Sequence, residues 1–187
     1  EDIMSCENLD DPIKADSSKE NNNNTSNNFN NNQNSDNSQI LKSPISGKIL
    51  DLSKVPDEIF ASKLMGDGIA IEPTSGIITS PVDGTIAQLF WTNHATGIIT
   101  DSGIEILIHV GIDTVKMEGR GFKAFVSQGD KVKTGDKLLE VDLDLVKKEA
   151  ESIITPIIIT NSQQFKSIEK LKDGNIKNEE TLLKINF

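Results

Sequence analysis

Two histidines, His94 and His109, are the side chains of this sequence best suited to chemistry near neutral pH, and the chain has no others. An imidazole can act as a general acid or base, bind a metal or attack an electrophile. The single cysteine, Cys6, lies near the N-terminus. The sequence therefore predicts no disulfide and no thiol chemistry in the folded part.

His109 stands at the end of an apolar segment, residues 104–110 (IEILIHV). Strand alternation places the isoleucines at 104, 106 and 108 on one face, and Glu105, Leu107 and His109 on the other. Gly111 then leaves room for close approach and supplies a free carbonyl. This pattern predicts a partly exposed histidine at a strand end. A structural histidine, hydrogen-bonded at the strand end, fits the same pattern.

The residues alone allow three kinds of site. A catalytic zinc usually has three protein ligands, so Asp113 would have to join the two histidines. A general acid–base pair is a second possibility, although no serine or cysteine nucleophile with a recognisable elbow accompanies it. In the third, one histidine takes up a phosphoryl group through an unprotonated ring nitrogen, while the other stabilises charge on the equatorial oxygens.

The elements that must position these histidines are strands. Short segments rich in β-branched residues recur between Gly, Pro, Asp and Ser, which favours an all-β fold, an antiparallel β-sandwich of the barrel-sandwich type. The segments are 45–50, 69–71, 76–79, 84–90, 97–100, 104–110, 122–126, 137–141 and 153–159. Residues 142–152 have helical spacing, with acids early and lysines later, so one or two short helices are expected.

The sequence also contains an internal echo. Residues 43–49 (SPISGKI) recur as residues 80–86 (SPVDGTI). Proline presets one turn position and glycine supplies another, so each copy is predicted to be a turn that leads into a strand. Similar turns are expected at residues 129–132 and 135–138. Repeated turn–strand units indicate a sandwich with quasi-two-fold order.

Composition divides the chain near residue 40. Residues 21–37 contain 11 asparagines, and such a segment buries too little apolar surface to offset its ordering entropy. We expect residues 1–39 to be a disordered Asn-rich tail or interdomain linker and residues 40–187 to form one domain. Residues 1–39 carry −6 of the net charge of −10. The absence of a basic patch argues against nucleic acid as a partner.

Five separated motifs resemble the glucose-type enzyme IIA domain of the bacterial sugar phosphotransferase system, and the resemblance runs from about Leu41 to Phe187. The motifs are residues 55–73 (VPDEIFA, then MGDGIAIEP), 80–86 (SPVDGTI), 92–95 (TNHA), 108–115 (IHVGIDTV) and 129–136 (GDKVKTGD). The resemblance implies a phosphoryl carrier without a cofactor. Its phosphohistidine would be His109, which accepts the group from phospho-HPr and donates it to a cysteine of the cognate IIB domain.

The same resemblance assigns further residues. His94 would be the second active-site histidine, held by Thr92, and the Gly111 carbonyl would hold the other nitrogen of His109. Asp57 and Asp113 would face basic residues of partners. The apolar docking face would comprise Phe60, Phe90, Leu107 and Val110, and Leu107 and Val110 stand where the family often has phenylalanine. Thr96 and Gly97 also depart from the family, in which an aromatic residue usually follows the histidine motif.

The family also implies a location and a context. The domain would be cytoplasmic, and the Asn-rich segment resembles the linkers that tether such domains to fused membrane IIC and IIB domains. Parts of the sequence also fit other functions. Residues 80–86 and 129–140 also resemble a biotinyl or lipoyl carrier, whose nearest lysine motif here would be residues 115–117 (VKM). A zinc-dependent hydrolase on a related sandwich would use Asp113 as a ligand.

Overall fold

The computed structural model describes residues 37–187. The expected tail or linker therefore lies outside the described residues except at its end, where β1 begins at Ser38. The strands are β1 (Ser38–Lys42), β2 (Gly47–Leu50), β3 (Asp67–Pro73), β4 (Ile77–Thr79), β5 (Gly84–Leu89), β6 (Ala95–Ile99), β7 (Glu105–His109), β8 (Phe122–Ala124), β9 (Lys131–Val132), β10 (Lys137–Val141), β11 (Thr155–Ile159), β12 (Ser167–Lys170), β13 (Asn175–Ile176) and β14 (Thr181–Asn186). The helices are α1 (Glu58–Ala61) and α2 (Leu143–Glu149), with 3₁₀ turns η1 (Leu52–Lys54), η2 (Thr114–Met117) and η3 (Ser162–Gln164).

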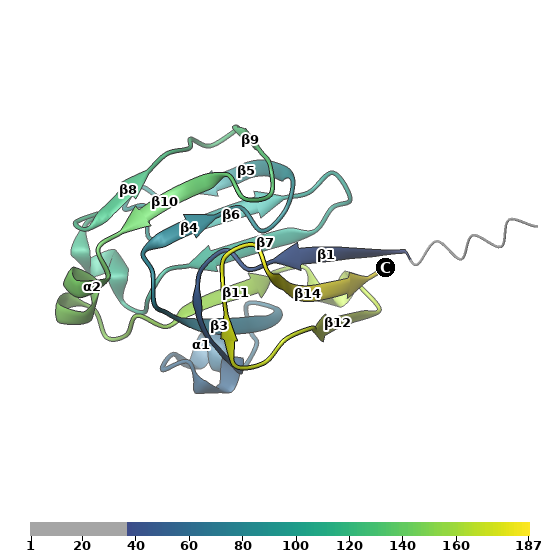
Figure 1. Cartoon of the computed structure of the whole chain (residues 1–187), viewed down its shortest axis with the longest axis horizontal. Coiled ribbons are helices and arrows are strands. Elements are labelled where there is room, and N and C mark those ends of the chain that lie inside the picture. The colour runs from purple at the N-terminus through teal and green to yellow at the C-terminus, as the bar shows by residue number, and fades with distance from the viewer. Residues whose placement is uncertain (1–36) are drawn as a thin grey trace, which may run out of the picture. The chain divides into compact units, whose positions relative to one another are not determined.

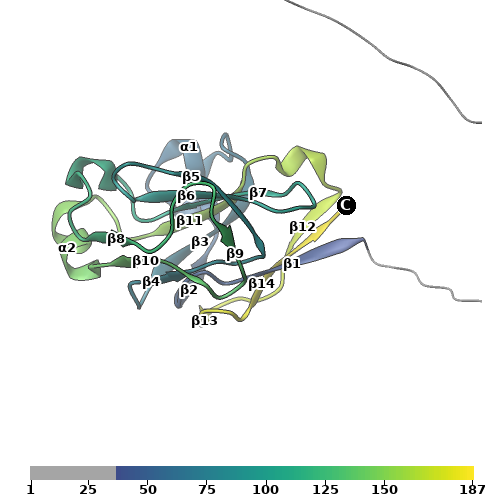
Figure 2. The same cartoon turned by 90° about the horizontal axis from the view of Figure 1, so that it is seen from above.

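Three antiparallel sheets form the domain (Figure 1). The largest has the strand order β13-β2-β3-β11-β7-β6-β5-β9, and the two smaller ones have the orders β4-β10-β8 and β1-β14-β12. Seen from above, α1 lies on the side of the large sheet away from β4, β8 and β10 (Figure 2). The expected all-β antiparallel sandwich with few helices is confirmed.

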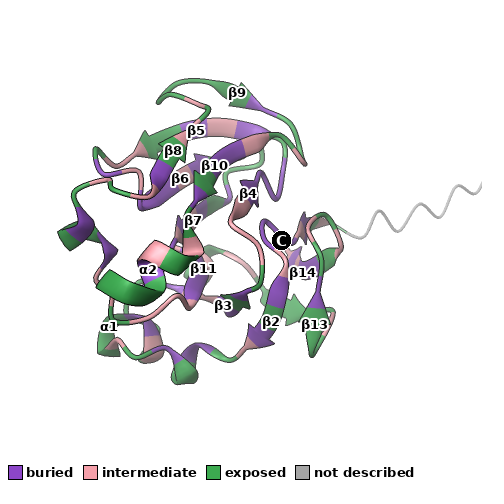
Figure 3. Cartoon of the chain, turned by 60° about the vertical axis from the view of Figure 1, so that its left-hand side comes forward, coloured by how far each residue is buried: buried purple, intermediate pink, exposed green. Residues whose placement is uncertain are grey.

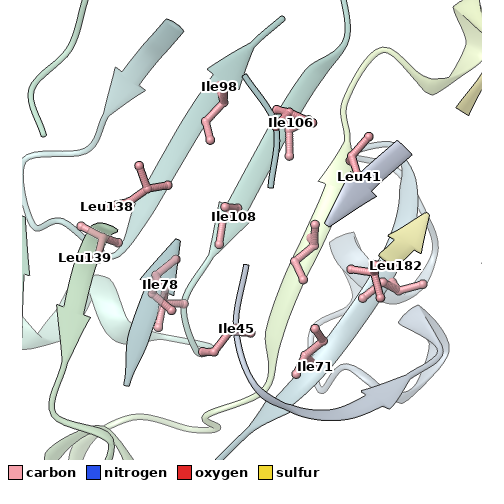
Figure 4. Packing of buried hydrophobic residues seen from close by; sticks show 14 of the residues in the cluster. Leu41, Ile45, Ile71, Ile78, Ile98, Ile106, Ile108, Leu138, Leu139 and Leu182 are labelled. Atoms are coloured by element: carbon pink, nitrogen blue, oxygen red, sulfur yellow. The ribbon is translucent and has the colours of Figure 1, made fainter. Parts of the chain in front are cut away.

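The large sheet is covered on both faces, and the central strand β11 shows this most clearly. Ile157 and Ile159 belong to the main core between the sheets, whereas Ile158 belongs to a second cluster with Leu52 and Phe60. A strand buried on both faces has a continuous apolar sequence, as this one has. Figure 4 shows the main core between the sheets, and Figure 3 shows exposed residues on loops, on the outer side of α2 and on short strands such as β9 and β13.

The internal echo corresponds to a reciprocal pairing of two turns. The Lys42 amide donates to the Pro81 carbonyl over 2.9 Å, and the equivalent Thr79 amide donates to the Pro44 carbonyl over 2.8 Å. The hydroxyl groups of Ser43 and Ser80 each donate to the carbonyl two residues later. The two copies therefore bind one another as halves of a quasi-symmetric frame, as the repeat predicted.

All nine apolar segments overlap strands of the structure, and the helix expected at residues 142–152 is α2. The Asp142 carboxylate caps α2 by accepting from the Leu145 amide over 3.0 Å. The expected turns at 129–132 and 135–138 are present, since Asp130 and Asp136 accept from the amides of Ser127 and Lys133. The strands β1, β12, β13 and β14 lie outside the expected segments. β12 and β13 contain a single apolar residue each, whereas the apolar residues of β1 and β14 were a strand signal that was missed.

Within residues 37–187, no helix combines the length and the apolar character needed to cross a membrane.

We predict that Gly47→Ala lowers the free energy of unfolding by roughly 1–3 kcal/mol, the usual cost of forcing an atom into a packed site. A Cβ at Gly47 would lie 2.2 Å from the Glu72 carbonyl oxygen, so the β2–β3 backbone would have to shift. Gly97→Ala is the matched control, because its Cβ would come no closer than 3.6 Å to its neighbours. Urea unfolding measures both, and equal losses would contradict the packing account.

Candidate functional site

The β6–β7 hairpin brings the two histidines together. His94 precedes β6 and His109 ends β7, and Ala95 pairs with His109 in the ladder. The Val110 amide donates to the His94 carbonyl over 2.8 Å, and this bond holds the two segments together beyond the end of the ladder. The ring centroids lie 5.0 Å apart with an edge-to-face angle of 77°.

His109 is held in one tautomer by the turn that follows it. Its Nδ1 lies 2.8 Å from the carbonyl oxygen of Gly111. A carbonyl only accepts, so Nδ1 carries the proton and donates it. In the neutral ring, Nε2 is then unprotonated and has a lone pair available for attack.

The Gly111 carbonyl depends on a tightly built turn. Gly111 has φ +71°, and a Cβ there would lie 2.7 Å from Thr114 Cγ2 and 2.8 Å from the Ser152 carbonyl oxygen. The Thr114 hydroxyl donates to the Val110 carbonyl over 2.8 Å, and the Ile112 amide donates to the Ser152 carbonyl over 2.8 Å. Because glycine alone fits this position, the turn explains why the residue two places after His109 is Gly.

Thr92 orients the ring of His94. The Thr92 hydroxyl and Nδ1 of His94 share a hydrogen bond, and the Thr92 residue is fully buried. Asn93 between them takes a left-handed conformation, with φ +57°. This sharp turn lets residues 92 and 94 face one another, so the Nε2 edge of His94 is the one left for other contacts.

An aromatic ring packs against each histidine. The Phe60 ring lies 5.1 Å from that of His109, and the Phe90 ring lies 5.4 Å from that of His94, centroid to centroid. Phe60 comes from α1, which Asp57 caps by accepting from the Ile59 amide over 2.8 Å. The histidines thus sit between apolar rings on the outer face of the large sheet.

Comparison with known proteins now identifies the family. Residues 39–165 match the family described as phosphoenolpyruvate-dependent sugar phosphotransferase system, EIIA 1.

The chain belongs to this EIIA family.

Individual relatives agree with this assignment. The glucose-specific EIIA component of Bacillus cereus is 53% identical over 133 residues, which make up 71% of this chain and 81% of that protein. A glucoside-specific EIICBA component of Staphylococcus carnosus is 45% identical over 147 residues, 79% of this chain but 21% of that protein. The structure of glucose permease IIA from Mycoplasma capricolum aligns with a TM-score of 0.76 at 43% identity, covering 79% of this chain and 95% of the other.

The family assignment makes this EIIA domain a component of a sugar phosphotransferase system, a phosphoryl carrier in sugar transport. It decides against the biotinyl or lipoyl carrier and the zinc hydrolase. The geometry agrees, because Lys116 of the supposed lysine motif lies in η2 rather than at a hairpin tip. Among residues 37–187, no three His, Cys, Asp or Glu side chains converge as metal ligands would.

Burial lowers the pKa of both histidines in the EIIA domain. The pKa of His94 falls to about 4, first because burial penalises the imidazolium and second because His109 lies beside it. Burial also lowers the pKa of His109, against the Gly111 hydrogen bond and the nearby Asp57 charge, which raise it. Both rings are therefore neutral at pH 7.

The residues expected on the docking face differ in accessibility. Phe90 and Leu107 are partly exposed, whereas Phe60 is 7% exposed and contacts His109. The expectation for Val110 was wrong, since its side chain is fully buried in the main core. It lies on the face of the β7 continuation opposite His109, so it supports the turn and cannot touch a partner.

The two carboxylates that were expected at the rim also differ. Asp57 is half-buried at the N-terminus of α1, and it forms no ion pair with any residue in the described range. Asp113 follows the Gly111 turn in a left-handed conformation, and its carboxylate is paired with Lys116. The family resemblance led us to expect both at the rim, but it did not predict the pairing of Asp113 with Lys116.

Several exposed apolar side chains near the histidines were also missed. Trp91 is 77% exposed beside Thr92, Ile59 is 52% exposed on α1 next to Phe60, and Val115 is 45% exposed on η2. They lie in loops and short helices, where strand alternation gives no signal. Their place in the sequence could have identified them, because Ile59 and Val115 belong to the family motifs and Trp91 directly precedes one.

We predict that His94 makes the EIIA domain less stable in acid. The folded-state pKa of about 4 lies below the ordinary 6.5, so the unfolded chain binds more protons between these values. Stability is therefore full above pH 6.5 and falls by about 3 kcal/mol as the pH drops to 4. Unfolding free energies of wild type and His94→Gln between pH 7 and 4.5 test this. Parallel curves for the two proteins would contradict it.

Proposed function

We propose that this EIIA domain accepts a phosphoryl group on Nε2 of His109 from the phosphohistidine of HPr and donates it to a cysteine of its cognate IIB domain. The observation that carries the proposal is the hydrogen bond from His109 Nδ1 to the Gly111 carbonyl. It leaves the other ring nitrogen as the nucleophile and fixes the direction in which its lone pair points.

In the loading step, the lone pair on Nε2 attacks the phosphorus atom of the donor. A new N–P bond forms as the N–P bond to the donor histidine breaks, and that bond's electron pair returns to the donor imidazole. The low pKa of His109 supports this step, because an unprotonated Nε2 is present at neutral pH. As His109 becomes positively charged during transfer, the Gly111 carbonyl stabilises the Nδ1 proton.

His94 is suited to hold the phosphoryl oxygens. If the Thr92 hydroxyl donates to Nδ1 of the neutral ring, the His94 proton resides on Nε2. That N–H then donates toward negative charge at the neighbouring His109, whose ring centroid is 5.0 Å away. The low pKa of His94 keeps the ring neutral. It can therefore hydrogen-bond the phosphoryl oxygens without forming a tight ion pair with them.

The apolar surroundings serve the transfer by excluding water. Phosphohistidine is a reactive species, and a docked partner must cover it to prevent hydrolysis. Phe60 and Phe90 flank the pair, while Leu107 and the exposed Trp91 extend the apolar surface outward. In the unloading step, a cysteine thiolate of IIB attacks the phosphorus and the His109 N–P bond breaks.

The covalent context is proposed by analogy. The relative from Staphylococcus carnosus is named as an EIICBA component and is far longer than its matched segment. By analogy, this EIIA domain would be joined to IIC and IIB domains through the Asn-rich segment. Free or joined, it would act at the cytoplasmic face of a membrane.

We predict that His109→Ala abolishes uptake of acid-labile phosphate from phospho-HPr. The substitution removes the nucleophile from a partly exposed position, so the fold should survive. The measurement is intact mass after incubation with phospho-HPr, with circular dichroism as the check on folding. A folded alanine variant that still gains one phosphoryl group would exclude His109 as the acceptor.

We predict a different result for His94→Gln. This variant should still be loaded, because its His109 nucleophile and Gly111 acceptor are unchanged, but it should pass the group to IIB more slowly, on the order of 100-fold. Rapid-quench transfer to the IIB cysteine measures the rate. The His94→Gln variant also serves as the matched control for His109→Ala. Unloading of this variant at the wild-type rate would remove His94 from the mechanism.

A further inference from the structure

Lys116 follows His109 by seven positions and neutralises the Asp113 carboxylate. Its ammonium is paired with the carboxylate of Asp113, the residue that follows the Gly111 turn by two positions. The Lys116 and Asp113 side chains are 72% and 40% exposed. The pair is therefore on the surface and within reach of any protein that docks over His109.

The local backbone enforces this pairing. Asp113 is the residue before η2, a 3₁₀ turn that spans Thr114–Met117. The Lys116 amide donates to the Asp113 carbonyl over 3.2 Å, and this bond across the start of the turn brings the two residues together. The carboxylate does not cap η2. The Asp113 carboxylate is paired instead with Lys116, and this contact raises the pKa of Lys116.

Asp57 differs from Asp113 in that no lysine or arginine of the described residues pairs with its carboxylate. Its carboxylate accepts from the amides of Ile59 and Phe60 and, within the described residues, forms no ion pair. It is close enough to His109 to raise the pKa of that ring. A basic partner therefore meets one available carboxylate at α1 and one already neutralised carboxylate at η2.

The pair falls inside the contact area of a normal docked protein. Asp113 lies four positions after His109, so at most about 14 Å of chain joins them. An interface of ordinary size covers about 800 Å² on each partner, which corresponds to a radius of roughly 16 Å around His109.

The geometry points to Lys116 as a specificity-determining residue, which shields Asp113 and thereby weakens the docking of the basic phosphoryl donor on the histidine pair. This inference rests on the proposed function. Lys116 touches no reacting atom. It acts through the charge of Asp113, so it changes how readily the donor docks and not the rate of the transfer step.

The test measures phosphate uptake by the full chain from phospho-HPr over a range of donor concentrations, at about 20 mM and 300 mM salt. Lys116→Gln keeps most of the side-chain stem and removes the charge. We expect it to raise kcat/KM about two- to five-fold at low salt, the range for an exposed ion pair. The kcat at saturating donor should not change, and the gain should shrink at high salt.

A charge cycle separates shielding from a direct contact. Asp113→Asn should lower kcat/KM, because it leaves the Lys116 cation without its partner carboxylate. The double variant restores the neutral balance and should lie within about two-fold of wild type. If Lys116→Gln is unchanged or slower than wild type, or if the double variant falls well below it, the shielding role is overturned.

Lys131→Gln is the matched control for loss of one charge. Lys131 is 75% exposed and lies 3.7 Å from Asp101, and its strand β9 pairs with β5 at Gly84 and Thr85. That is the end of β5 opposite Phe90, about 20 Å along the strand. An equal gain in this variant would overturn the local role of Lys116. If wild type takes up no phosphate from phospho-HPr, the proposed function itself fails.

Discussion

The hydrogen bond between His109 and the Gly111 carbonyl is the constraint on which the site depends. It decides which ring nitrogen is protonated, and so which one can attack. The acceptor is a backbone atom two residues away, which requires the chain to reverse immediately after β7. Only a residue without a Cβ fits that reversal, because Thr114 and the Ser152 carbonyl leave no space. The chemistry of one side chain therefore prescribes its glycine neighbour.

The rest of the fold supplies the conditions under which this bond is useful. Burial between aromatic rings lowers the pKa of both histidines, whereas the position of His109 at a strand end keeps it partly exposed. A deeper site would keep the same tautomer but would be closed to a partner protein. In a more open site, burial would no longer lower the pKa and keep the ring neutral. The outer face of the large sheet provides the compromise, since η1 and α1 cover β3 and β11 and stop beside β7.

Sequence was sufficient for much of this arrangement. The alternation at residues 104–110 placed His109 opposite the core isoleucines, and the repeat at 43–49 and 80–86 predicted the reciprocal turns. In contrast, the contact between His94 and His109 depends on the register of β6 and β7, which no local pattern encodes. Val110 was misplaced because family motifs report position and not burial. The Asp113–Lys116 pair was missed because it depends on a 3₁₀ turn that periodicity does not reveal.

The pairing of β1 with β14 has a consequence for how the domain can be built into larger proteins. Ser38 lies opposite Asn186, and the Phe187 amide donates to the Asn37 carbonyl over 2.8 Å. The first and last described residues therefore lie side by side, near the β6–β7 turn, where the Ser102 hydroxyl donates to the Gln39 side chain. This turn and His109 stand at opposite ends of β7. Segments joined to the domain at Asn37 or at Phe187, or a circular permutation that links these two residues, would leave from the same corner and spare the histidine face.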